Sequence, residues 1–62
     1  MSLTLTPNIP DPDGFYDRLL AAHEGLSDAD SAALNARLVL ILANQIGNRQ
    51  ALDAAIAAAT RP

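Results

Sequence analysis

The sequence predicts an all-α protein, a small helix-turn-helix-turn-helix domain preceded by an extended N-terminal arm. Three prolines within six residues near the start exclude a helix there, whereas apolar residues recur at helical spacing in the remainder of the chain. Gly25 and Gly47 divide that remainder into three segments. We therefore expect an arm at residues 1–11 and a three-helix domain at residues 12–60.

The arm alternates Leu3 and Leu5 with small polar residues, which is the spacing of a β-strand. No second strand is predicted with which it could pair. We therefore expect Leu3 and Leu5 to contact a partner, either by adding a strand to the edge of its sheet or by pairing with the same arm of a second copy. The alternative is that the two leucines fold back on the helices without forming a strand.

The first helix is predicted at residues 12–24. Asp11 is suited to the N-cap, Pro12 to the first helical position, and Gly25 to the left-handed conformation that ends a helix. The polar face, opposite an apolar arc, carries Asp17, Arg18 and Glu24. This pattern is typical of an amphipathic helix with one side towards a core.

The second and third helices are predicted at residues 28–46 and 49–59. Ser27, with an acidic residue three positions later, forms an acidic variant of the capping box. Gly47 is expected to end the second helix, and Asn48 is suited to cap the third. The two connections are therefore tight turns.

The second helix is apolar around most of its circumference. Arg37 and Asn44 form its one consistent polar strip, and its apolar positions are Leu34, Leu38, Val39, Leu40, Ile41, Leu42, Ala43 and Ile46. A helix of this kind belongs in the middle of a packed structure. The other two helices are too short and too poor in large side chains to surround it, so we expect another polypeptide to cover the rest. The domain is therefore expected to be oligomeric.

Composition excludes several classes of function. The absence of cysteine excludes disulfides and thiolate metal sites, and no cofactor is expected. A net charge of −3 disfavours nucleic acid and anionic membrane surfaces, and the second helix lacks the basic face of a DNA-reading helix. The longest apolar run has six residues, and no basic region followed by an apolar segment opens the chain, so neither a membrane span nor a secretory signal is expected. We expect a cytoplasmic protein.

The predicted interface joins the arm to the second helix and consists of Leu3, Leu5, Leu34, Asn35, Leu38, Leu42 and Ile46. Asn35 lies between Leu42 and Ile46 on the helical wheel, and a buried amide without a partner costs about 1–3 kcal/mol. We expect Asn35 either to fix the register between helices or to cap a neighbouring backbone group within the monomer.

Two other motifs have structural explanations. The segment Asp11-Pro12-Asp13-Gly14 lacks the later oxygen ligands and the closing glutamate of a calcium loop, so helix capping is expected instead. His23 lies near a helix end, where its charged form suits the helix dipole, and no serine, cysteine or carboxylate stands at a spacing that marks a catalytic partner. No catalytic residue and no metal ligand is predicted.

Several segments together resemble a known family. They are Asn8-Ile9-Pro10-Asp11-Pro12-Asp13, Phe15-Tyr16, Leu26-Ser27, and Leu34-Asn35-Ala36-Arg37-Leu38 running on to Ala43-Asn44-Gln45-Ile46-Gly47. Over nearly its whole length the chain resembles small bacterial proteins catalogued as domain of unknown function 2783. That family carries no established catalytic residues, so the resemblance transfers no site. It implies a gene neighbourhood of FAD-dependent oxidoreductases of aromatic degradation, which suits an accessory subunit and assigns no cofactor.

We weigh three functional hypotheses. The leading one is a non-catalytic protein–protein interaction module, either a homo-oligomer or a small accessory subunit of a bacterial assembly, for which the resemblance suggests an oxidoreductase. The alternative is a small-molecule binding or catalytic module with a pocket between protomers around Tyr16, His23, Asn35 and Arg37. The third, a monomeric three-helix bundle without a partner, is disfavoured by the apolar circumference of the second helix.

Overall fold

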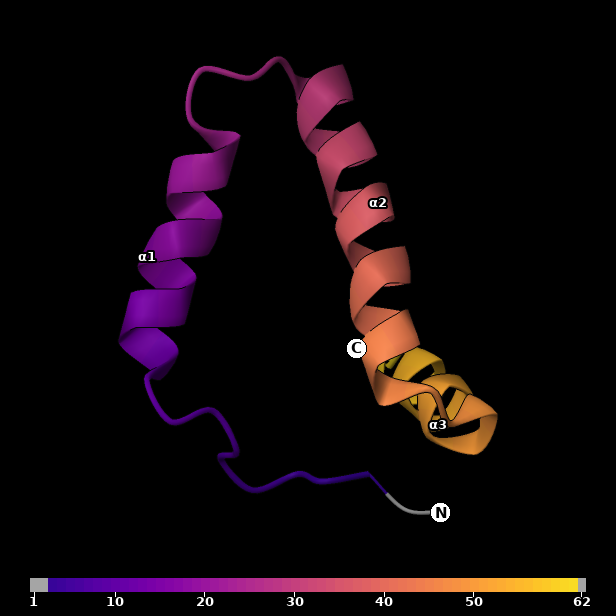
Figure 1. Ribbon diagram of the computed structural model, residues 1–62. Helices are drawn as coiled ribbons and strands as arrows, with labels where there is room; N and C mark the ends of the chain where they lie inside the picture. Colours follow the sequence, from indigo (N-terminus) through magenta and orange to yellow (C-terminus); the bar gives the residue numbers. More distant parts are fainter. Residues whose placement is uncertain (1–2, 62) are drawn as a thin grey trace.

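The computed structural model describes residues 3–61 and contains three helices: α1 (Pro12–His23), α2 (Asp28–Ile46) and α3 (Arg49–Ala59) (Figure 1). Because residues 3–61 contain no β-strand, the prediction of a small all-α domain with three helices is confirmed. α1 ends one residue earlier than predicted, because Glu24 has a ψ of 133° and has left the helical region. Residues 1–2 of the predicted arm lie outside the described residues.

Residues 3–11, which belong to the predicted arm, form neither helix nor strand. Leu3 is half-buried, whereas 83% of Leu5 is exposed. The two leucines therefore have different surroundings, although the alternating pattern treats them as equivalent. Pairing of this segment with a partner stays a prediction.

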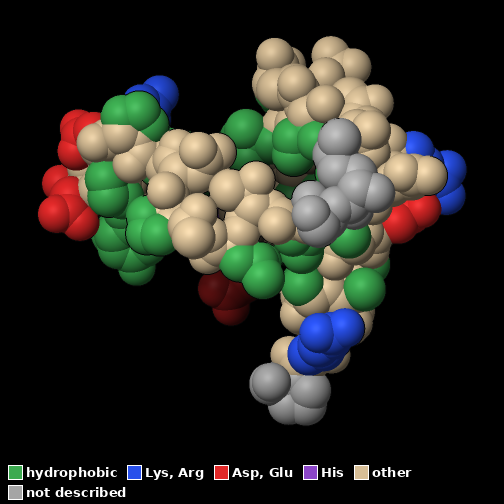
Figure 2. Space-filling view, turned by 90° about the horizontal axis from the view of Figure 1, so that it is seen from below, with side chains coloured by type: hydrophobic (Ala, Val, Ile, Leu, Met, Phe, Trp, Pro, Cys, Tyr) green, Lys and Arg blue, Asp and Glu red, His purple; other side chains and the backbone are tan. Residues whose placement is uncertain are grey.

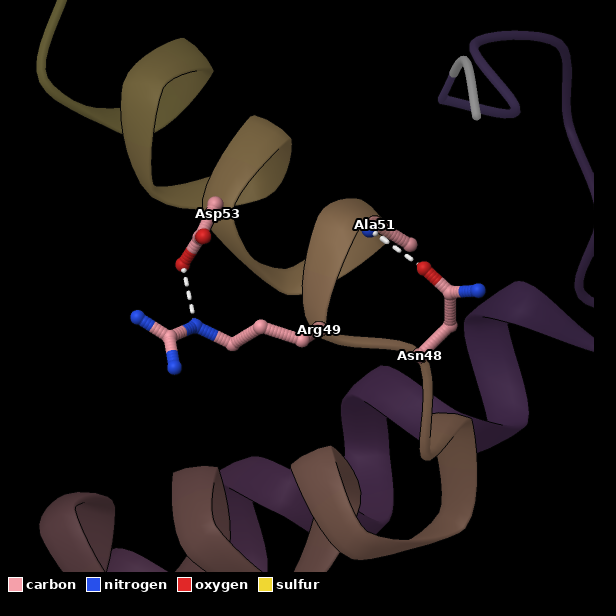
Figure 3. A network of polar contacts seen from close by, with 4 residues as sticks. All are labelled: Asn48, Arg49, Ala51 and Asp53. Atoms are coloured by element: carbon pink, nitrogen blue, oxygen red, sulfur yellow. Dashed lines mark hydrogen bonds and ion pairs between the residues drawn. The ribbon is translucent and has the colours of Figure 1, made fainter.

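Each helix begins at a side-chain cap that the sequence predicts. Asp11, Ser27 and Asn48 each accept a hydrogen bond from the backbone N–H three residues later, at 3.1, 3.2 and 2.8 Å respectively. Figure 3 shows this bond for Asn48, whose Oδ1 accepts from the N–H of Ala51. These bonds satisfy donors that a helix leaves without partners in its first turn. The starts of all three helices are thus specified locally.

Two glycines end α1 and α2 by adopting the left-handed conformation. Gly25 has a φ of 75° and Gly47 a φ of 72°. The N–H of Gly47 donates to the carbonyl of Ala43 at 2.9 Å, which satisfies one of the last acceptors of α2. L-residues with a side chain rarely adopt this positive φ, and the left-handed conformation costs them roughly 1–2 kcal/mol. The turns therefore fix where the chain reverses.

The helices form an open arrangement rather than a closed bundle. α1 and α2 make an antiparallel hairpin whose arms separate away from the turn, and α3 lies at the far end of the hairpin (Figure 1). The most extensive helix–helix contact joins α2 to α3. The two shorter helices thus meet different parts of α2 instead of enclosing it together.

None of the described residues is buried. The chain exposes 5366 Å², whereas a compact monomer of 6.5 kDa exposes about 3,800 Å². The radius of gyration is 13.3 Å, against about 10.6 Å for a compact domain of 62 residues. Both quantities show that a single copy has no closed hydrophobic core.

The surface of α2 contains a continuous run of exposed aliphatic side chains. Val39, Leu40 and Ile41 are 63%, 72% and 58% exposed. Three consecutive aliphatic side chains of α2 therefore have little cover within the described chain.

No helix within residues 3–61 combines the length and the apolar character needed to cross a bilayer.

Replacing Asn48 with alanine should lower the free energy of unfolding by about 1 kcal/mol, because the N–H of Ala51 loses its acceptor. Urea denaturation followed by circular dichroism measures this loss. Asn44→Ala is the matched control: it replaces an exposed asparagine inside α2, where alanine is the better helix former, and should not destabilise the protein. Equal losses in the two variants would contradict the capping role.

Candidate protein interface

The first candidate surface is a groove between α1 and α2, called here the hairpin groove. It has a volume of about 380 Å³ and is lined by Phe15, Arg18, Leu19, Ala22, Leu34, Arg37, Leu38 and Ile41. On each helix these positions follow the spacing i, i+3, i+4, i+7, which places them on one face over about two turns. The groove is therefore an apolar channel with one arginine on each wall.

Arg18 and Arg37 have no acidic partner in the described chain. Within residues 3–61, neither side chain forms an ion pair or a hydrogen bond. The chain has four basic residues in total and a net charge of −3. Half of its cationic side chains thus line a single apolar groove of an acidic protein.

The second candidate surface lies between α2 and α3 and is called here the helix-three groove. Its volume is about 550 Å³, and it is lined by Val39, Leu40, Leu42, Ala43, Ile46, Arg49, Leu52, Ala55 and Ile56. The large side chains include Ile46 and Ile56, which are 57% and 62% exposed. Seen from below, the molecule exposes hydrophobic side chains across its face, with most charged side chains at the margins (Figure 2). The helix-three groove is thus the more aliphatic of the two surfaces.

The arginine of the helix-three groove is already paired. The Nε of Arg49 donates to the Oδ1 of Asp53 at 2.9 Å, one helical turn later (Figure 3). This hydrogen bond, together with the charge of Asp53, raises the pKa of Arg49 above its ordinary value. Because both side chains are largely exposed, the pair adds little to stability. The carboxylate of Asp53 offsets the positive charge of Arg49, whereas Arg18 and Arg37 have no such partner in the described chain.

His23 and Asn35 connect α1 to α2 near the turn. The Nδ1 of His23 lies 2.8 Å from the carbonyl oxygen of Leu19, and its Nε2 lies 2.9 Å from the Oδ1 of Asn35. Both neighbours are acceptors, so a neutral ring donates to only one of them and a protonated ring donates to both. The partner of Asn35 is a side chain of α1, so this contact is not the backbone capping that one of the two hypotheses for Asn35 described. A role of Asn35 between chains stays a prediction.

The predicted interface residues are divided between the two grooves. Leu34 and Leu38 line the hairpin groove and are half-buried, while Leu42 and Ile46 line the helix-three groove. Asn35 lines neither groove and holds His23 instead. The sequence pattern placed these positions on one surface that faces a partner. In the folded chain, two of them line the groove beside α1 and two line the groove beside α3.

The alternative site around Tyr16, His23, Asn35 and Arg37 is brought together only in part. His23 and Asn35 are in contact, whereas Arg37 lines the hairpin groove, which none of the other three residues lines. Tyr16 is 58% exposed. Within residues 3–61, no group of three or more His, Asp or Glu side chains is placed to hold a metal ion.

Sequence reasoning missed several residues that line the grooves. Arg18 was assigned to the polar face of the first helix, yet it lines the hairpin groove beside Leu19. The spacing of Phe15, Arg18, Leu19 and Ala22 is the signal that could have placed it there. Leu52 and Ile56 of α3 were also omitted, although they stand at i and i+4 on one helix face.

Residues 3–61 match the DUF2783 family, which is described as a protein of unknown function. The chain belongs to the DUF2783 family. This match confirms the resemblance drawn from the sequence segments. No match was found among curated proteins or among solved structures. The description of the DUF2783 family gives no activity.

Replacing Asn35 with alanine should loosen the hairpin, because the Nε2 of His23 loses its acceptor on α2. We expect the free energy of unfolding to fall by about 0.5–1.5 kcal/mol. Asn35→Asp retains an acceptor oxygen and should keep most of the stability. Urea denaturation of both variants measures the difference, and identical losses for alanine and aspartate would show that the contact with His23 contributes nothing.

Proposed function

We propose that this protein is a non-catalytic interaction module that functions within an assembly, either with further copies of itself or as a small subunit of a larger bacterial protein complex. The absence of a buried side chain among the described residues carries this proposal. Two apolar grooves, one between α1 and α2 and the other between α2 and α3, supply the contact surfaces. The assembly is what provides α2 with the cover that one copy lacks.

The uncovered area has the size of a stable interface. The chain exposes 5366 Å², at most about 1,500 Å² more than a compact monomer of its mass. Two copies that each buried this excess would form an interface of about 3,000 Å² in total, which lies in the range of obligate homodimers. Part of this excess is apolar, since Val39, Leu40 and Ile41 are 63%, 72% and 58% exposed, and monomeric proteins rarely expose large contiguous apolar patches.

The shape of the surfaces favours a protein partner over a substrate. Enzyme sites enclose most of their ligand and bring a few polar groups together at its reacting atoms. In the described chain the two grooves are open and lined mainly by aliphatic side chains. The one side-chain contact within the alternative site, between His23 and Asn35, is used to join two helices. Large apolar surfaces with few polar anchors are typical of assembly interfaces.

The solution mass of the purified chain tests the proposal directly. Light scattering should give a mass at least twice the 6.5 kDa of one chain. The melting temperature should rise with protein concentration, because mass action stabilises an assembly and leaves a monomer unchanged. A well-folded monomer with a concentration-independent melting temperature, which also retains no larger protein from its native host, would overturn the proposal.

The variant Ile46→Glu should weaken self-association, because it places a charge on an apolar side chain that is 57% exposed in one copy. Burying an unpaired carboxylate at an interface is strongly unfavourable. Asn44→Glu is the matched control: it adds the same charge two positions away, on the polar strip, and should leave the mass unchanged. Sedimentation equilibrium measures both, and equal masses for the two variants would remove the helix-three groove from the interface.

A further inference from the structure

The two unpaired arginines of the hairpin groove stand on opposite walls, Arg18 on α1 and Arg37 on α2. The contact between His23 and Asn35 sets the register of these walls at the end nearest the turn. Arg18 is five residues from His23, and Arg37 is two residues from Asn35. At about 1.5 Å per residue, the two backbone positions are offset by roughly 4.5 Å along the groove. This offset is shorter than an arginine side chain, so both guanidinium groups can turn towards one anionic group between the walls.

We propose that the hairpin groove binds an amphipathic helix of another protein that carries a carboxylate within its apolar face. This inference rests on the proposed function and names the chemistry of one partner. Apolar side chains of the bound helix would occupy the channel, and its Asp or Glu would lie between Arg18 and Arg37. Arginine pairs with carboxylates through two parallel hydrogen bonds, which gives such a site both orientation and specificity.

The dimensions of the hairpin groove suit a helix. Its walls repeat at i, i+3, i+4 and i+7 over about two turns, which matches the anchor spacing of helix-in-groove recognition. A small apolar carboxylate would be poorly enclosed, because Phe15 is 45% exposed and no described residue is buried. A helix instead spans the full length of the channel and covers both walls.

A second copy of this chain is a poorer occupant. In α2 the acidic residues stand only in the first turn, away from its large aliphatic side chains. In α3 the only carboxylate, that of Asp53, is already paired with Arg49. In α1, Asp13 stands in the first turn, and Asp17 is not among the residues that line the hairpin groove. No helix of the described chain therefore offers a free carboxylate in the middle of an apolar stripe.

Fluorescence anisotropy with two labelled peptides tests the proposal on the full chain. Both peptides carry leucines at i, i+3 or i+4, and i+7, and they differ only in having glutamate or lysine at positions within that apolar face. We expect the glutamate peptide to bind at least about tenfold more tightly, equivalent to about 1.4 kcal/mol. The net charge of −3 alone predicts the opposite order. Equal binding, or tighter binding of the lysine peptide, would overturn the proposal.

Charge reversal locates the interaction. Arg37→Glu should abolish or reverse the preference for the glutamate peptide, and Arg18→Glu should do the same. Arg61→Glu makes the same charge change outside the groove and should leave the preference intact. If Arg61→Glu is as damaging as Arg37→Glu, the effect is one of overall charge and the proposal fails. Circular dichroism of each variant confirms that the helices are retained.

A third peptide separates helix docking from simple anion binding. It keeps the glutamates and replaces the leucines with alanines, and its affinity should fall at least about tenfold. Undiminished binding would show that the arginines attract any anion, and would overturn the proposal of a helix partner. Self-association is measured independently of these peptides. An oligomer that binds none of them would refute this inference alone, whereas peptide binding by a stable monomer would refute self-association alone.

Discussion

The apolar circumference of α2 is the constraint on which the rest of the structure depends. This helix has 19 residues, while α1 has 12 and α3 has 11. Each shorter helix can cover only part of one side, and the hairpin opens away from its turn so that α1 covers less still. Burial of aliphatic side chains is the main favourable term in folding, and none is buried among residues 3–61. This is the observation from which the proposed assembly is argued.

The two grooves are consequences of this arrangement, and they differ in their chemistry. The helix-three groove is aliphatic and its arginine is neutralised by Asp53, so it suits a contact driven by desolvation. The hairpin groove combines a similar apolar floor with the unpaired Arg18 and Arg37. Charged groups at an interface contribute more to specificity than to affinity. In the assembly that we propose, the helix-three groove would serve general association and the hairpin groove would select the partner.

Local hydrogen bonds, rather than a hydrophobic core, specify the ends of the helices in this open fold. The caps at Asp11, Ser27 and Asn48 and the left-handed glycines specify where the helices begin and end. Such contacts are worth on the order of 1 kcal/mol each, too little to fix the angles between helices. Only the pair of His23 and Asn35 joins side chains of α1 and α2 through a hydrogen bond. The angle between the hairpin arms is therefore a property that a partner can stabilise.

The sequence by itself determined the helices, their caps and glycine stops, and the excess of apolar surface on α2. These features depend on residues within a few positions of each other, which is why Ser27 and Gly47 could be recognised without a structure. Only the tertiary structure decided that Leu34 and Leu42 face different neighbours, that Asn35 holds His23, and that an arginine lies on each wall of one groove. Those relations depend on how the helices cross, and the crossing is set by packing between residues that are distant in the sequence.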